Sequence, residues 1–342
     1  MKGAHLLAVM LRPKIVLPIV LAAALFAVAF KLGDLGAVLA RVRAIPLWAM
    51  ALALAGAIVY LAFKLLQFRH LVTNLGLRPD WRRLTLAFCV GELAVTLPFG
   101  IFAQNWILAV GSKEDFGRSS AATVVMLLTE ILVVLLFLAV IGIPGWPELR
   151  PLAIVFVLGL LVVVFGVLRY GHVARRLGHR VQRRGLRRVL LQFIELLRGL
   201  RRLSRPQLLL LNVLIAGVYL GALAFAFFVT GRAVGIANLS FLTAATIYAF
   251  SLAVLLLFGG ILSQIGTMEV LGMSASQAWG LSLTQGLALM LGFRIVWTGA
   301  MWLVNLPLVF FLWRSIEHRH AKPVASPAAA IAPSQPAAKA AD

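Results

Sequence analysis

Long runs of apolar residues, separated by short polar or basic segments, fill most of the chain. An α-helix needs about 20 apolar residues to cross a bilayer, and eight runs approach that length. They cover residues 15–31, 46–66, 119–142, 152–168, 207–229, 241–258, 276–293 and 295–313. They are rich in Leu, Ala and Val and lack the alternation over about 10 residues that marks barrel strands. The pattern predicts an all-α polytopic membrane protein with about eight transmembrane helices.

Two further apolar stretches, 84–110 and 259–275, contain helix-breaking residues at membrane depth. The first holds Pro98 and two glycines, and the second holds four glycines. Their polar side chains of interest are Glu92, Gln104, Asn105, Gln264 and Glu269. Irregular backbone at this depth is tolerated only inside protein or beside a watery cavity. We therefore expect two re-entrant or broken helical segments. A kinked full span for 84–110 and a loop for 259–275 remain the alternative.

Composition and charge support a membrane location and an orientation. Hydrophobic residues make up 62% of the chain and charged residues 13%, whereas soluble domains are about half apolar and a quarter charged. If 84–110 returns to the side it entered from, most of the 32 Lys and Arg residues lie on one side. Positive charge marks the cytoplasmic side, which predicts that both termini are cytoplasmic. The positive-inside rule explains the net charge of +21 without a nucleic-acid partner.

The domain organisation follows from the same pattern. We expect a cytoplasmic N-terminus over 1–14 and a single transmembrane domain over 15–313. The first apolar run resembles a signal peptide, but its length and the many later runs favour a retained anchor. Residues 314–342 end in a Pro- and Ala-rich stretch with few large apolar groups, so we expect a disordered cytoplasmic tail.

The loop 169–206 is the most basic segment, with twelve arginines and one acid, Glu195. From Leu186 to Leu200 its apolar residues recur at helical spacing, which predicts a basic amphipathic helix. Such a helix lies flat on an anionic inner leaflet. The arginines expected to contact lipid headgroups are Arg183, Arg184, Arg187, Arg188, Arg201 and Arg202. A topology anchor without a ligand is the alternative.

Acids within apolar runs are the strongest candidates for chemistry. An ionised side chain at the bilayer centre costs at least ~2.5–3.5 kcal/mol, so Glu130, near the middle of its run, needs a partner from another segment or from water. We expect Glu92 or the Gln104 and Asn105 pair to supply it. The predicted polar cavity for substrate comprises Glu92, Pro98, Gln104, Asn105, Glu130, Gln264, Glu269 and Arg294. The alternative is a set of interhelical hydrogen bonds and interface anchors.

Signatures of enzymatic chemistry are absent from the sequence. It has no P-loop, no HExxH, no GxSxG and no cluster of His and Cys at metal-ligand spacing. Its single cysteine, Cys89, excludes an internal disulfide. We therefore expect a protein that is not an enzyme and that needs no catalytic residue, metal or cofactor.

Three stretches resemble a known family. GELAVTLPFGIFAQNWIL and GRSSAATVVMLLTEILVVLLF are similar to an order of Pro-Gly, then Gly and Arg, then a span with Glu. SQIGTMEVLGMSASQAWGLSLTQGLALMLGFRIVW is similar to an order of Gly-x-x-Glu, an alanine-rich helix and Arg. Over about residues 10–315 the chain resembles the transmembrane-region family of lysylphosphatidylglycerol synthases, also called flippase-like membrane proteins. Departures from its pattern occur at 263–266, Thr129-Glu130 and Phe293-Arg294.

The resemblance implies eight spans, two re-entrant segments and translocation of a lipid or lipid-linked glycan. We expect a flippase or transporter of the bacterial inner membrane, with membrane lipids, anionic at the inner leaflet, as partners. Glu92, Glu130 and Glu269 would contact a cationic or hydroxyl-bearing headgroup or relay protons. The alternative is a non-transporting scaffold or accessory subunit for an enzyme of lipid or glycan synthesis.

Overall fold

Helices make up all the regular structure in the described part of the chain, apart from one isolated bridge between Ile143 and Trp146. The computed structural model describes residues 27, 31, 34–95, 100–109, 116–143, 146–178, 184–258 and 264–320. The helices are α3 (Leu35–Arg43), α4 (Leu47–Asn74), α5 (Trp81–Ala94), a 3-10 turn η1 (Gly100–Phe102), α6 (Ala103–Ala109), α7 (Phe116–Ile141), α8 (Leu149–Gly178), α9 (Arg184–Leu203), α10 (Pro206–Ala233), α11 (Phe241–Phe258), α12 (Gln264–Gln277) and α13 (Leu283–His320). The predicted all-α class is confirmed.

Four helices are long and apolar enough to cross a membrane: α4, α7, α10 and α13 up to Ile316. Two shorter apolar segments, Leu149–Val162 in α8 and Phe241–Leu257 in α11, coincide with further predicted spans. The predicted span 15–31 lies almost entirely outside the described residues. Polytopic helical organisation is thus present, and the count of eight spans stays a prediction.

The predicted division into spans 276–293 and 295–313 is wrong. Residues from Leu283 to His320 form one helix of 38 residues. Arg294 suggested a break because a charge usually marks a membrane boundary. In the structure Glu269 of α12 pairs with Arg294, so the helix continues through this position. Residues 314–320 are helical too, which corrects the expected start of the disordered tail; residues 321–342 lie outside the described part.

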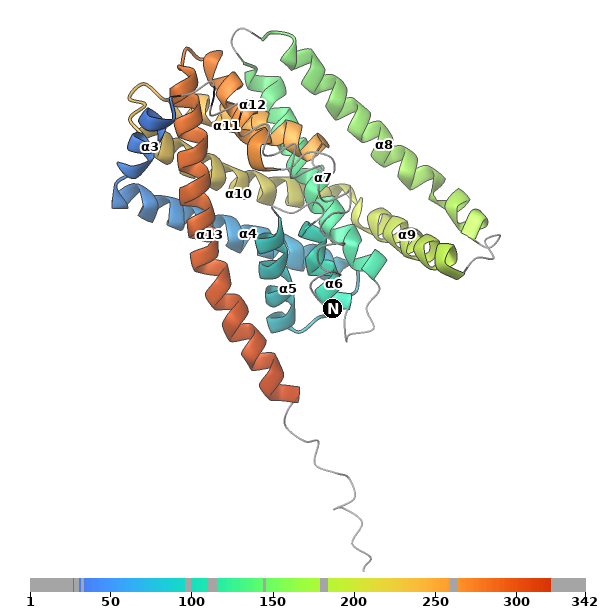
Figure 1. The fold of residues 1–342 in the computed structure, drawn as a ribbon. Helices are drawn as coiled ribbons and strands as arrows, with labels where there is room; N and C mark the ends of the chain where they lie inside the picture. Colours follow the sequence, from blue (N-terminus) through green and yellow to red (C-terminus); the bar gives the residue numbers. More distant parts are fainter. Residues whose placement is uncertain are drawn as a thin grey trace, which may run out of the picture.

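Helices α4 and α10 lie next to each other at the centre, and α13 crosses them (Figure 1). Small residues allow the close approach: Ala49, Ala53 and Ala57 of α4 are almost fully buried. At Gly56 an added Cβ would lie 3.3 Å from the carbonyl oxygen of Ala222 on α10. In lipid, where water does not drive helices together, small residues permit the backbone contact that stabilises such pairs.

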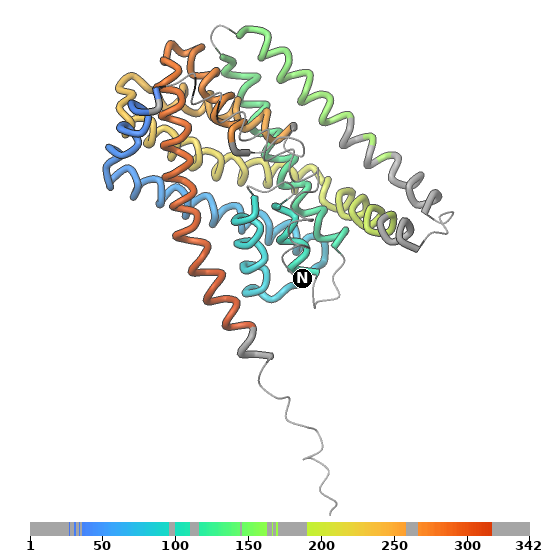
Figure 2. Tube along the Cα trace, viewed as in Figure 1, coloured from blue at the N-terminus to red at the C-terminus, as the bar shows by residue number. Residues whose placement is uncertain are grey.

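Helices α5 and α6 form an antiparallel hairpin, where the chain trace doubles back (Figure 2). The Arg83 guanidinium, near the start of α5, donates to the carbonyls of Ile107 and Leu108 at the end of α6, at 2.9 and 3.2 Å. Further along, Gly91 faces Gln104, where an added Cβ would approach the Gln104 Cβ to 2.9 Å. The stretch 84–110 is therefore a broken helical segment that folds back, and a single kinked helix does not describe it.

A second antiparallel hairpin joins α12 to α13. Gly272 packs on Met290, and Gly286 packs on Ser276. In each pair the two residues lie at similar distances before and after the turn, as expected for antiparallel helices. Gly280 makes the turn with a φ of +75°, a backbone conformation that favours glycine. The predicted interrupted stretch 259–275 is helical from Gln264 onward, so the loop alternative is wrong for that part. Both α5 and α12 pack against α13.

The predicted amphipathic helix exists as α9, and it packs on the first turns of α7. Contact is through glycines: the Gly117 amide donates to the Gln192 side chain, and Gly199 lies against Ala121. Ile194 and Leu203 of α9 are buried, while Arg198, Arg201 and Arg202 of the same helix are exposed. One face of α9 therefore binds the helical bundle and the other presents charge.

We expect Gly117→Val to lower the stability of the protein by about 1–3 kcal/mol, a typical cost of overpacking. A Cβ at this position would collide with the Gln192 carbonyl, so α9 has to move away from α7. Thermal unfolding in detergent measures the effect. Gly159→Val on α8, where an added Cβ meets nothing within 4 Å, is the matched control. Equal melting temperatures for the two variants would show that the α7 and α9 contact is unimportant for stability.

Candidate functional site

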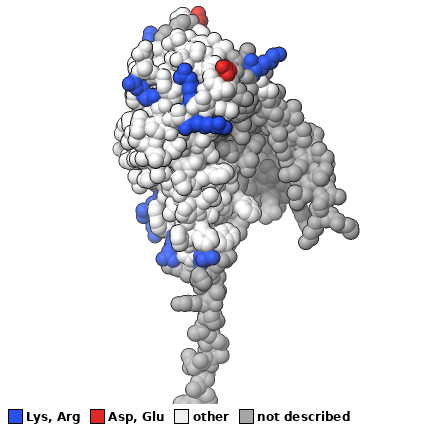
Figure 3. Space-filling model, turned by 60° about the vertical axis from the view of Figure 1, so that its left-hand side comes forward, with Lys and Arg blue, Asp and Glu red and all other residues white. Residues whose placement is uncertain are grey.

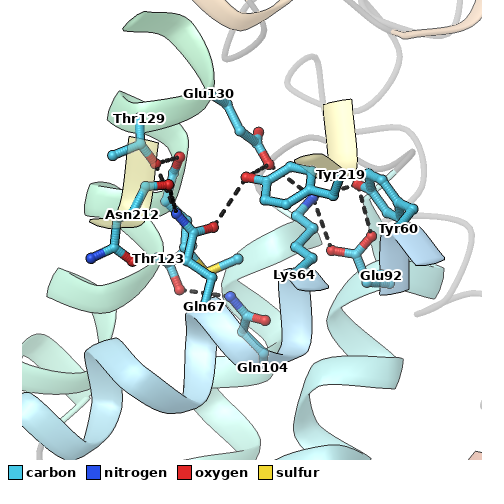
Figure 4. A network of polar contacts seen from close by, with 11 residues as sticks. Tyr60, Lys64, Gln67, Glu92, Gln104, Thr123, Thr129, Glu130, Asn212 and Tyr219 are labelled. Carbon is cyan, nitrogen blue, oxygen red and sulfur yellow. Dashed lines mark hydrogen bonds and ion pairs between the residues drawn. The ribbon is translucent and has the colours of Figure 1, made fainter. Parts of the chain in front are cut away.

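A buried lysine lies at the centre of the bundle. Lys64 of α4 is 3% exposed, and its Nζ lies 3.2 Å from Glu92 Oε1 of α5 and 3.1 Å from Glu130 Oε1 of α7. Figure 4 shows the ammonium between the two carboxylates. Three helices thus each supply one charge to the same point. Breaking such a buried pair leaves an uncompensated charge and is strongly destabilising.

Two tyrosines complete what we call the Lys64 cluster, which comprises Tyr60, Lys64, Glu92, Glu130 and Tyr219. Lys64 Nζ donates to the Tyr60 hydroxyl at 2.5 Å, and this hydroxyl donates to Glu92 Oε2 at 3.3 Å. Tyr60 and Lys64 are four residues apart on α4 and therefore share a helix face. The Tyr219 hydroxyl of α10 lies 2.9 Å from Glu130 Oε1. Every member of the cluster is buried.

The cluster lacks one positive charge. It contains one ammonium and two carboxylates, all within ion-pair distance. It also lacks one donor, because the single hydroxyl proton of Tyr219 faces both Glu130 Oε1 and, at 3.1 Å, Gln67 Oε1. A single group that brings one positive charge and one further donor would satisfy both counts. One proton, or one cation from a ligand, therefore completes the site.

Polar contacts beside the cluster tie α4, α7 and α10 together. The Gln67 amide donates to the Thr129 hydroxyl and to the Asn212 carbonyl, both at 3.1 Å. Thr129 in turn donates to the Met126 carbonyl within α7. Since all three side chains are buried, these bonds fix the helices that present Lys64, Glu130 and Tyr219.

The partners expected for Glu130 were incorrect in part. Its direct contacts are Lys64 and Tyr219, and Glu92 joins the same site through Lys64. Gln104 and Asn105 instead donate to the Thr123 hydroxyl, each at 2.7 Å, and so attach α6 to α7. Their carbonyl oxygens are buried and have no hydrogen-bond partner among the described residues.

Glu269 and Arg294 form a second polar site between α12 and α13. The Glu269 side chain is 1% exposed and that of Arg294 is 23% exposed. Glu269 also accepts from the Gly266 amide at 2.8 Å, and Gly266 has a φ of +85° that suits glycine. The backbone therefore holds the carboxylate toward the arginine.

Aromatic rings lie between the two polar sites. Trp297 stacks on Phe293 with centroids 5.5 Å apart, and its ring meets that of Tyr60 at 5.4 Å. Tyr248 also contacts Phe293 at 5.4 Å. Aromatic rings thus lie between the Lys64 cluster and the pair of Glu269 and Arg294.

Six of the predicted residues lie outside the described part of the chain or have side chains that the structure does not describe. Pro98 and Arg183 fall outside the described residues. The helical positions whose side chains are not described are Gln264, Arg184, Arg187 and Arg188. Arg201 and Arg202 are exposed on α9, and Arg202 donates to the Leu75 carbonyl at 3.3 Å.

Lys64, Tyr60 and Tyr219 were not among the site residues predicted from the sequence. Lys64 is the only charged residue of its apolar run, 46–66. An ammonium at membrane depth needs a partner for the same reason as the Glu130 carboxylate does. That signal was available and would have paired the lysine with a buried acid. Neither tyrosine stands out, because tyrosine is common in apolar segments.

The outer surface and the buried charges together define a polytopic integral membrane protein. On the face in Figure 3, Lys and Arg lie toward the two ends and an uncharged band separates them. The chain matches the family model of the lysylphosphatidylglycerol synthase TM region over residues 15–305 and belongs to that family. The resemblance noted in the sequence is therefore confirmed. No curated protein matches the chain.

Proposed function

We propose that this protein moves a lipid or lipid-linked glycan across the bacterial inner membrane. The observation that supports this function most is the Lys64 cluster, where two carboxylates share one ammonium inside the helical bundle. Ionisable residues inside membrane segments are expensive and usually serve substrate or proton pathways. A site short of one positive charge suits a cationic or hydroxyl-bearing headgroup, or a proton that exchanges during transport.

In this proposal the α5–α6 hairpin and α12 belong to two re-entrant segments that flank the headgroup path. Each segment provides one buried acid, Glu92 from α5 and Glu269 from α12, and both α5 and α12 pack on α13. Acyl chains would remain in lipid along exposed apolar side chains such as Leu303 on α13 and Val162 on α8. Discontinuous helices that meet at a central polar site are a recurring plan in transporters.

We expect both termini and α9 to be cytoplasmic. Arginines are concentrated on α9 and its flanks, and the positive-inside rule places such segments in the cytoplasm. Reporter fusions at positions 185 and 335, with one reporter active only in the cytoplasm and another only outside, measure this. A periplasmic signal at either position would reverse or break the proposed topology.

Transport can be tested with purified protein in vesicles of phosphatidylethanolamine and phosphatidylglycerol that contain a trace of acyl-labelled NBD phosphatidylethanolamine. External dithionite destroys only label that reaches the outer leaflet, so the slow phase reports translocation. We expect wild-type protein to speed this phase and Glu92→Gln to slow it by about tenfold, equivalent to ~1.4 kcal/mol.

The matched control is Glu195→Gln, which removes a carboxylate from α9 that pairs with Arg198 three residues further along the helix. This variant should transport at the wild-type rate. If the wild type does not accelerate dithionite loss of any headgroup tested while remaining folded, the accessory-subunit hypothesis gains and the transport proposal fails.

A further inference from the structure

A pocket of about 400 Å³ lies between the C-terminal end of α4 and the start of α5. Its polar lining consists of Arg69 and Thr73 from α4, Arg78 from the connecting turn, and Trp81 at the start of α5. Buried Val72 and Leu84 form its apolar lining. The pocket is separate from both polar sites described above, since it shares no residue with them.

The pocket faces outward from the bundle. Lys64 and Arg69 are five residues apart on α4, which places them roughly 140° apart around the helix axis. Lys64 therefore points into the bundle while Arg69 is exposed. Leu66, one turn before Arg69 on the same exposed side, is 50% exposed. In a membrane this stripe of α4 would place Leu66 beside lipid tails and Arg69 in the headgroup region.

Two guanidinium groups, those of Arg69 and Arg78, line the pocket. Neither Arg69 nor Arg78 makes an ion pair within the part of the chain that the structure describes. The Arg69 guanidinium lies 4.9 Å from the centroid of the Trp81 ring, which orients it. Guanidinium groups match the geometry of phosphate oxygens, and the exposed Thr73 hydroxyl adds a further donor.

The surroundings place the pocket at the basic end of the molecule. Arg118 of α7 and Arg202 of α9 both donate to the Leu75 carbonyl, directly after α4. Trp81 is 48% exposed, and tryptophan favours the level of lipid headgroups. This side of the molecule therefore offers arginines for a phosphate, Leu66 for an acyl chain, and a tryptophan at the level of the headgroups.

We propose that this pocket binds the phosphate-bearing headgroup of an anionic glycerophospholipid from the leaflet on the α9 side. The phosphate contacts Arg69 and Arg78, and the acyl chains lie along Leu66. Because α5 begins at Trp81 and carries Glu92, such a lipid would hold the base of the hairpin that supplies one acid to the Lys64 cluster. The site stands independently of any transport activity.

The test is native mass spectrometry of the full-length protein titrated with phosphatidylglycerol in detergent. Arg69→Gln/Arg78→Gln should weaken the tightest phosphatidylglycerol binding by about tenfold or more, because two charge-assisted contacts are lost. Arg82→Gln, an exposed neighbour outside the pocket lining, should change it less than twofold. Lipid-free melting temperatures equal to wild type would show that all variants are folded.

Two further arms separate the possible sources of the phosphate. Phosphatidylcholine, which has a phosphate but no net charge, should bind at least several-fold more weakly than phosphatidylglycerol. Millimolar inorganic phosphate should leave bound phosphatidylglycerol in place. Displacement by inorganic phosphate would assign the pocket to a free anion and overturn the lipid assignment. Unchanged phosphatidylglycerol binding in the folded double variant would overturn the site itself.

Discussion

Lys64→Met is expected to destabilise the protein by about 3–5 kcal/mol, the typical cost of removing one partner from a buried ion pair. The change keeps much of the side-chain volume but leaves Glu92 and Glu130 facing each other with no ammonium between them. Both carboxylates are buried, at 4% and 5% exposure, so water cannot replace the lost partner. Tyr60 also loses the donor that orients its hydroxyl. Thermal and denaturant unfolding in detergent measure the loss.

Neutralising the acids should restore most of that stability. In Lys64→Met/Glu92→Gln/Glu130→Gln no charge remains in the cluster, and replacing a whole buried ionic group with neutral residues is often tolerated. Arg198→Met, which removes an exposed cation from α9, is the control and should change stability by less than about 0.5 kcal/mol. A triple variant no more stable than Lys64→Met would show that charge imbalance is not the cause.

Neutral residues can stabilise the bundle equally well. Stability alone therefore gives no reason to keep three charged residues in it. The cluster also leaves one charge and one donor unmatched, which a purely structural polar network would avoid. This mismatch favours a role in handling a proton or a cationic headgroup. It also means that stability and transport should respond differently to changes at Glu92 or Glu130.

The length of the apolar runs predicted the helical class, because a helix needs about 20 apolar residues to cross a bilayer. It failed at Arg294, where a local rule about charge marked a boundary. A charge inside a helix is tolerated once a neighbouring helix supplies its partner, and Glu269 is such a partner. That pairing depends on α12 folding back on α13, which no local pattern encodes.

The candidate site shows the same limit. Glu92 and Glu130 stood out because they are acids in apolar runs, and the structure brings both to Lys64. Which helices face each other depends on packing of small residues such as Gly56 against Ala222. Gln104 and Asn105 were polar at the right depth but turn toward Thr123 instead. Sequence identifies which side chains need partners, and packing decides which ones they find.

Glu130→Gln should leave stability within about 1 kcal/mol of wild type, the scale of one hydrogen bond, and reduce transport at least about tenfold, equivalent to ~1.4 kcal/mol. The amide removes the excess negative charge and can donate to Tyr219, which then donates to Gln67. The hydrogen bonds of the folded state are therefore kept. An amide cannot take up and release a proton, nor can it attract a cationic headgroup as a carboxylate does.

Glu130→Leu separates the structural role from the functional one. It removes both the ion pair with Lys64 and the acceptor for Tyr219, so we expect a loss of about 1–3 kcal/mol together with loss of transport. Lys64 keeps Glu92 as its counterion, which makes this cost smaller than that of Lys64→Met. Dithionite accessibility and detergent unfolding on the same preparations give both readouts, with Glu195→Gln as the common control. If Glu130→Gln transports normally and only Glu130→Leu is unstable, the carboxylate serves helix packing; an active and equally stable Glu130→Leu would remove Glu130 from both roles.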